Sequence, residues 1–115
     1  MIDLIKFRPV FKFWLETDRG YVFGEGPFEI LSKVQEIGTL SGAAKALKMS
    51  YRQAWGMIKE IENELGEPLL KTRKGGVSGG GSAELTEASL ALLGKYSKTK
   101  QELAEFSKRI IADYL

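Results

Sequence analysis

The feature that most constrains the fold lies over residues 38–66, where a short and a longer helical pattern are separated by a tight turn. Small and apolar residues over 42–48 predict the short helix, and Ser41 before them is a good N-cap residue. The turn is expected at Lys48 and Met49. Because the side chains of the short helix are small, we expect it to pack closely against its neighbours.

The longer helix of the pair is expected to run from Tyr51 to Leu65, with Ser50 as its N-cap and Gly66 as its stop. Apolar residues recur along it at intervals of four, three and four, which predicts one buried stripe. That stripe consists of Ala54, Ile58, Ile61 and Leu65. A short helix, a tight turn and a second helix with a polar first turn form the sequence pattern of a helix-turn-helix.

An N-terminal hairpin or arm is expected over residues 1–26. Apolar and polar residues alternate imperfectly over 4–15 and again at 21–23, and Gly20 is available for a positive φ in the turn between them. Pro9 cannot donate a hydrogen bond to a ladder, so its strand is expected at an edge or a bulge.

The remaining patterns complete a mainly α fold with small β content. They predict a first helix over 27–37, two short strands on either side of a glycine-rich loop at 71–82, and a last helix that opens at Thr86. A strand pair after the second helix of a helix-turn-helix is a wing. The prediction is therefore one winged-helix domain, with the hairpin followed by a winged helix-turn-helix over 27–85 and a long helix over 86–115.

The last helix carries a long apolar stripe. About 30 residues at 1.5 Å each extend over ~45 Å, which is too long for a domain of this size to cover entirely. Either the N-terminal hairpin and first helix bury the stripe or a second chain does, and its heptad-like spacing favours a homodimer. The expected interface residues are Leu92, Tyr96, Leu103, Phe106 and Ile110.

The first turns of the second helix predict contacts to double-stranded DNA. In this motif the second helix enters the major groove, where Arg pairs with guanine and Gln with adenine. The expected contact residues are Ser50, Tyr51, Arg52, Gln53, Trp55 and Lys59. Alternatively, the helices form a three-helix core without a nucleic-acid role, and Tyr51 and Trp55 are packing aromatics.

The predicted wing strengthens the DNA-binding interpretation. Residues 41–83 carry a net charge of +3, whereas the whole chain carries only +2. Basic side chains can contact phosphates, and glycines let the backbone approach them closely. The expected wing contacts are Lys71, Arg73, Lys74, Gly75, Gly76, Gly79 and Gly80. The alternative interpretation of the loop is a flexible hairpin tip.

Composition argues against an enzyme. The chain contains neither cysteine nor histidine, which excludes thiol and imidazole catalysis, disulfides and the common zinc sites. Carboxylates remain, but Glu60, Glu62 and Glu64 are expected on a solvated helix face. No P-loop or metal loop is present, so we expect no metal and no cofactor. The start of the chain lacks the pattern of a signal peptide and no apolar run is long enough to span a bilayer, so a cytoplasmic protein without membrane contact is expected.

Several segments together resemble one family. They are Gly38-Thr39-Leu40-Ser41-Gly42-Ala43-Ala44-Lys45, Met49-Ser50-Tyr51-Arg52-Gln53-Ala54-Trp55, Gly75-Gly76 with Gly79-Gly80-Gly81-Ser82, and Leu85-Thr86. Over about residues 24–96 the chain resembles the DNA-binding domain of the molybdate-responsive transcriptional regulators (ModE-like). The segment 62–69 is also similar to the same region of LysR-type regulators, whose winged helix is related.

The resemblance implies a dimeric winged-helix regulator that binds operator DNA. Full members of the family carry a C-terminal pair of small β-barrel modules that bind molybdate or tungstate. Because the chain stops at Leu115, we expect it to lack these modules, and any molybdate or tungstate link is expected through the family or a partner protein.

Two other functions stay open on the sequence alone. The first is a protein-interaction or dimerisation module that kept the winged-helix fold without specific DNA binding, which the modest net charge allows. The second is an enzyme or oxyanion-binding protein that uses backbone amides of the glycine-rich loop.

Overall fold

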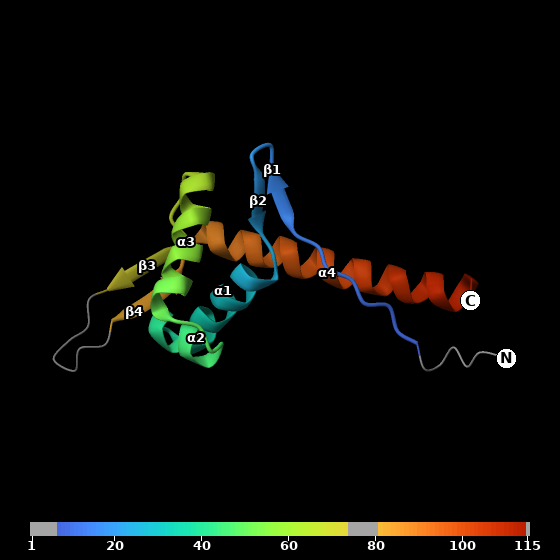
Figure 1. Ribbon diagram of the computed structural model, residues 1–115, viewed down its shortest axis with the longest axis horizontal. Coiled ribbons are helices and arrows are strands. Elements are labelled where there is room, and N and C mark those ends of the chain that lie inside the picture. Colours follow the sequence, from blue (N-terminus) through green and yellow to red (C-terminus); the bar gives the residue numbers. More distant parts are fainter. Residues whose placement is uncertain (1–6, 74–80, 115) are drawn as a thin grey trace.

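The computed structural model describes residues 7–73 and 81–114, in which one long helix carries the other elements on its first half (Figure 1). A mainly α fold with two small hairpins is confirmed. In chain order the elements are β1 (Leu15–Thr17), β2 (Gly20–Phe23), α1 (Glu25–Ile37), α2 (Leu40–Ala46), α3 (Tyr51–Leu65), β3 (Leu70–Arg73), β4 (Ser82–Leu85) and α4 (Glu87–Tyr114).

Helix α1 begins two residues before the expected start at Pro27. The carbonyl of Gly24 accepts a hydrogen bond from the amide of Phe28 at 3.0 Å, which adds Glu25 and Gly26 to the helix. Pro27 then lies in the first turn, where its missing N–H costs nothing. The predicted stop is confirmed, because Gly38 has φ +91° and its amide bonds to the carbonyl of Val34.

Helix α2 is capped by Thr39, so the prediction of Ser41 as N-cap was wrong. The Thr39 hydroxyl accepts a hydrogen bond from the amide of Gly42 at 3.0 Å, and Ser41 lies inside the first turn. A Cβ on Gly42 would come within 2.7 Å of both Thr39 Oγ1 and Ile37 Cγ2. Because Gly42 has no Cβ, the Thr39 hydroxyl can approach its amide closely enough to cap the helix. It also ends earlier than expected, at Ala46.

This cap gives a direct stability test. Thr39→Ala is expected to lower the free energy of unfolding by about 1 kcal/mol, because one amide of the first turn loses its partner. Ser41→Ala is the matched control and should change it by less than about 0.5 kcal/mol. Urea denaturation of both variants measures the difference, and a larger loss for Ser41→Ala would show that the cap is misassigned.

Helix α3 follows the predicted limits. The Ser50 hydroxyl accepts a hydrogen bond from the amide of Gln53 at 3.0 Å, and Gly66 ends the helix with φ +71°. Three residues of the predicted stripe are buried, whereas Leu65 is partly exposed. They are Ala54, Ile58 and Ile61, and they pack α3 onto the same core as α1 and α2.

The N-terminal hairpin is shorter than predicted. Strand β1 pairs antiparallel with β2 only over 15–17, while 7–14 form an arm without strand pairing that runs beside α4 (Figure 1). The hairpin also touches the far end of α3. Glu64 accepts a hydrogen bond from the Thr17 hydroxyl at 2.6 Å and forms an ion pair with Arg19 at 3.0 Å.

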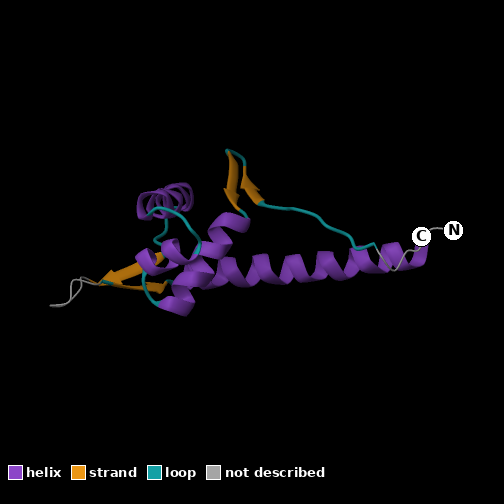
Figure 2. Ribbon diagram, turned by 60° about the horizontal axis from the view of Figure 1, so that its bottom comes forward, coloured by secondary structure: helices purple, strands orange, loops and turns teal. Residues whose placement is uncertain are grey.

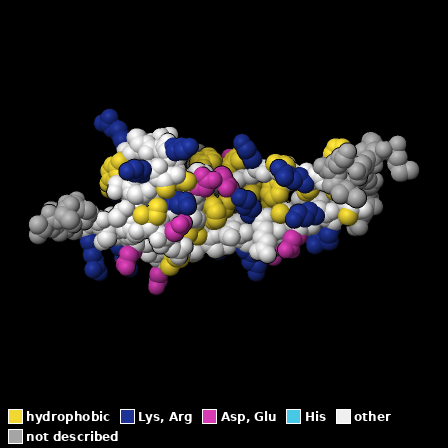
Figure 3. Space-filling view, turned by 90° about the horizontal axis from the view of Figure 1, so that it is seen from below, with side chains coloured by type: hydrophobic (Ala, Val, Ile, Leu, Met, Phe, Trp, Pro, Cys, Tyr) yellow, Lys and Arg dark blue, Asp and Glu magenta, His cyan; other side chains and the backbone are white. Residues whose placement is uncertain are grey.

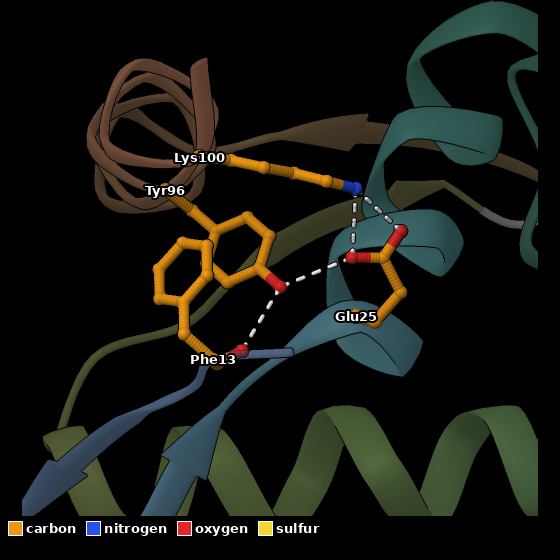
Figure 4. A network of polar contacts seen from close by, with 4 residues as sticks. All are labelled: Phe13, Glu25, Tyr96 and Lys100. Carbon is orange, nitrogen blue, oxygen red and sulfur yellow. Dashed lines mark hydrogen bonds and ion pairs between the residues drawn. The ribbon is translucent and has the colours of Figure 1, made fainter. Parts of the chain in front are cut away.

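Helix α4 closes the core with Tyr96. Its ring stacks on Phe13 at 4.5 Å between centroids and lies edge-on to Phe23 at 5.5 Å. The Tyr96 hydroxyl lies 3.1 Å from a carboxylate oxygen of Glu25, which also pairs with Lys100 at 3.0 Å (Figure 4).

Tyr96 was predicted at a dimer interface, but it is buried in the core of its own chain, and Leu92 is partly buried against that core. Phe13 of the arm and Phe28 of α1 cover this part of α4, because both rings pack against Tyr96. Beyond Lys100, α4 continues away from the other helices (Figure 2). There the predicted interface residues Leu103, Phe106 and Ile110 are 39% to 53% exposed.

Candidate nucleic-acid interface

The first two turns of α3 present polar and aromatic side chains to solvent. Arg52 and Gln53 are exposed, and Tyr51 and Trp55 are 53% and 38% exposed. The Tyr51 and Trp55 rings stack on each other, 6.3 Å between centroids and 12° between planes. The alternative that these two aromatics pack in a core is therefore wrong, since they form a surface ridge.

The N-termini of α2 and α3 meet the ends of the wing strands, at Arg73 and Ser82, around one shallow hollow of about 160 Å³. Its lining comes from the start of α2, the start of α3 and both wing strands: Thr39, Leu40, Ser41, Tyr51, Thr72, Arg73, Gly81, Ser82 and Ala83. First-turn amides of a helix lack intrahelical partners and favour anions. The hollow thus combines hydroxyls, one guanidinium and two helix N-termini, which suits a phosphate group.

Strands β3 and β4 form the predicted wing. They pair antiparallel from Leu70 opposite Leu85 to Arg73 opposite Ser82, and a bond of 2.8 Å from the Ala83 amide to the Gly38 carbonyl fixes β4 to the end of α1. Lys71 and Arg73 are exposed. The other expected wing contacts, Lys74, Gly75, Gly76, Gly79 and Gly80, lie outside the described residues.

On one face of the molecule, positive charge is spread along its length rather than gathered in one patch (Figure 3). Figure 3 shows Lys and Arg side chains over much of one face, with hydrophobic and acidic side chains between them. On the wing, Lys71 pairs in register with Glu84. Neighbouring acidic groups weaken non-specific attraction of phosphates.

Two carboxylates of α3 depart from the expected solvated face. The Glu62 side chain is only 13% exposed. Its carboxylate accepts a hydrogen bond from the amide of Leu69 at 2.7 Å and forms an ion pair with Lys59 at 3.0 Å. Partial burial raises the pKa of the Glu62 carboxyl, but these contacts outweigh it and hold the pKa below its usual value. Glu64 is partly buried under the hairpin. The helical period predicted both as outward, because it contains no information on the turn after Gly66, which meets Glu62, or on the hairpin, which meets Glu64.

Sequence reasoning missed the hydroxyls of Thr72 and Ser82 at the hollow. Period-2 alternation places side chains on strand faces but does not tell which face meets α3. Within 7–73 and 81–114, no group of three or more acidic residues is arranged to hold a metal ion. In the same part of the chain, no helix is both long and apolar enough to cross a bilayer.

A helix-turn-helix followed by a two-stranded wing, with an exposed polar start of the second helix, defines a winged-helix DNA-binding domain. Comparison with known families agrees with this class. The chain belongs to the bacterial regulatory helix-turn-helix proteins of the LysR family, whose family model matches residues 27–89.

Curated relatives confirm the ModE-like resemblance. The chain is 32% identical over 82 residues to the molybdenum transport protein ModE of Azotobacter vinelandii, which covers 71% of this chain and 30% of the relative. It is 36% identical over 63 residues to the transcriptional regulator ModE of Haemophilus influenzae, covering 55% and 25%. The DNA-binding transcriptional dual regulator ModE of Escherichia coli is 36% identical over 72 residues, covering 63% and 27%. The chain thus spans less than a third of the length of these relatives.

Solved structures share the fold. The DNA-binding domain of CbnR, crystallised in complex with DNA, superposes with a TM-score of 0.57 at 24% identity, covering 78% of this chain and 97% of that one. Full-length LysG from Corynebacterium glutamicum gives a TM-score of 0.55 at 22% identity, covering 76% and 28%.

Proposed function

We propose that this chain is a transcriptional regulator that binds operator DNA as a homodimer, with the start of α3 in the major groove and the wing on the adjacent backbone. The observation that carries the proposal is the placement of Arg52 and Gln53 on the exposed first turn of α3, beside the hollow that contains Arg73. The proposal includes no catalytic step, and DNA as a target would place the chain in the cytoplasm.

The proposed readout divides between bases and phosphates. Arg52 has a forked donor that matches guanine, and Gln53 has the donor and acceptor that match adenine. Ser50 spends its hydroxyl on the cap, so its expected role is to fix the helix start rather than to contact a base. The hollow and the wing would hold backbone phosphates, which position the helix without reading sequence.

Selection of duplex oligonucleotides from a random pool, followed by titration at several salt concentrations, tests the proposal. An enriched sequence with two half-sites and a dissociation constant that rises with salt is expected. If no duplex is retained even at low salt, DNA binding is wrong, and the second half of α4 becomes the candidate surface for a protein partner.

The proposed dimer uses Leu103, Phe106 and Ile110 on α4. These three side chains recur at intervals of three and four, so they share one face of the helix, and they extend the stripe that Tyr96 continues into the core. Like-facing stripes on two copies can pair through coiled-coil contacts. The half-sites would then be separated by the distance that the α4 pair sets between two copies of α3.

Phe106→Asp tests this surface. The variant is expected to sediment as a monomer and to bind a duplex with two half-sites at least tenfold more weakly, because a buried carboxylate opposes pairing. The matched control is Leu90→Asp, which changes an exposed leucine of α4 outside the stripe. A dimeric Phe106→Asp variant would show that copies meet elsewhere.

The names of the relatives suggest a regulon. Because several are called molybdenum transport or molybdenum-pterin-binding proteins, we propose that the genes controlled here concern molybdate or tungstate. Fragments co-enriched with the protein from its own genome should then lie beside genes for transport of these oxyanions. Enrichment only at unrelated genes would exclude the link.

A further inference from the structure

A continuous row of contacts runs along α3 from its base-reading end towards the wing. The Tyr51 ring stacks on Trp55, and the ammonium nitrogen of Lys59 lies 4.4 Å from the centroid of the Trp55 ring. The same nitrogen is 3.0 Å from Glu62. Spacings of four, four and three residues bring these side chains onto neighbouring turns of one helix.

The far end of the row is anchored at Leu69, just before β3. One carboxylate oxygen of Glu62 pairs with Lys59, and the other accepts the amide hydrogen of Leu69 at 2.7 Å. Leu69 is fully buried and directly precedes β3, so its position is fixed by the core. The row therefore links the exposed aromatic ridge to the residue just before the wing through two charge-assisted contacts.

We propose that Lys59 is a positioning residue that holds the Trp55 ring, and through it Tyr51, in register with the wing, rather than a phosphate contact. This inference rests on the proposed function and changes the role expected for Lys59. If the ammonium turned to a phosphate, it would leave the largely covered Glu62 carboxylate without its cation and the Trp55 ring without its electrostatic partner. Lys59 thus acts on sequence preference through Trp55.

Titration of DNA at several salt concentrations separates the two roles. Lys59→Met is expected to weaken binding to the selected sequence five- to tenfold. The ratio of affinities for the selected sequence and for random duplex should fall, while the slope of log affinity against log salt stays unchanged. Lys59→Arg should restore both, because guanidinium also stacks on indole and pairs with carboxylate. Arg73→Gln provides the contrast, since loss of one phosphate contact makes the negative slope shallower by about 0.9.

A slope that falls by about one in Lys59→Met, with sequence preference intact, would overturn the proposal. A second measurement needs no DNA. In a Trp14→Phe background Trp55 is the single tryptophan, and Lys59→Ala is expected to shift its emission to longer wavelength, because the ring loses the side chain that covers it. Unchanged emission would also overturn the proposal. Absence of DNA binding by the unaltered protein would instead contradict the proposed function, while the emission test would still apply.

Discussion

Tyr96→Ala is expected to lower the free energy of unfolding by about 3–5 kcal/mol, the range for removal of a large buried aromatic. Tyr96 is among the largest fully buried side chains and contacts the arm, the hairpin and α1 from α4. Its loss would leave a cavity where four segments meet. Urea denaturation followed by circular dichroism measures the effect, and a loss below about 1.5 kcal/mol would show that α4 is not the closing element of the core.

The conservative variant isolates the hydroxyl. Burial, together with the hydrogen bond to Glu25, raises the pKa of Tyr96 from 10.0 to about 12. Because the folded-state pKa lies above the unfolded one, the stabilisation is complete below pH 10 and is lost as the pH rises towards 12. Tyr96→Phe retains the ring and is expected to lose this component of the alkaline dependence. Identical alkaline profiles for the two proteins would contradict the assignment.

Arg52→Ala is expected to weaken binding to the selected operator by about 1–3 kcal/mol, which is roughly 5- to 150-fold, and to relax base preference at one position. The side chain is exposed on the first turn of α3 and has space to extend into a groove. Competition between the operator and duplexes altered at single positions measures both effects. Affinity should fall for the operator but not for unrelated duplexes, since the contact that is removed is to a base and not to a phosphate.

Lys95→Ala is the matched control for Arg52→Ala. It also removes one exposed positive charge, but from α4. Its effect on affinity is expected to be less than twofold and equal for all sequences. Equal losses in the two variants would show that net charge, rather than a base contact, accounts for binding.

Local patterns predicted the helices and hairpins well where a single residue decides the outcome. Gly38 and Gly66 end helices because they adopt positive φ, and Ser50 caps α3 because its hydroxyl reaches an amide three residues on. The choice between Thr39 and Ser41 could not be made in this way. Both have a hydroxyl, and the outcome depends on how closely Ile37 and Thr39 approach Gly42.

Tertiary contacts account for what the sequence did not predict. The stripe of α4 has one period throughout, yet Tyr96 is buried under the arm and α1, whereas Leu103, Phe106 and Ile110 are exposed. A periodic pattern does not reveal where the rest of the chain stops covering a helix. Likewise, the helical pattern predicts Glu62 as a solvated residue, whereas in the folded chain it accepts a hydrogen bond from the amide of Leu69.

In the proposed dimer, the exposed second half of α4 would link the order of this helix to protein concentration. From residue 101 to 112 no side chain is buried, although these residues continue the helix for three more turns. Isolated helices of that length are marginal in water. If two copies pair there as proposed, the second copy would stabilise these turns, and thermal unfolding of this segment is expected to move to higher temperature as the protein is concentrated. For a regulator, abundance in the cell would then set how much of it carries an ordered helix able to join two half-sites.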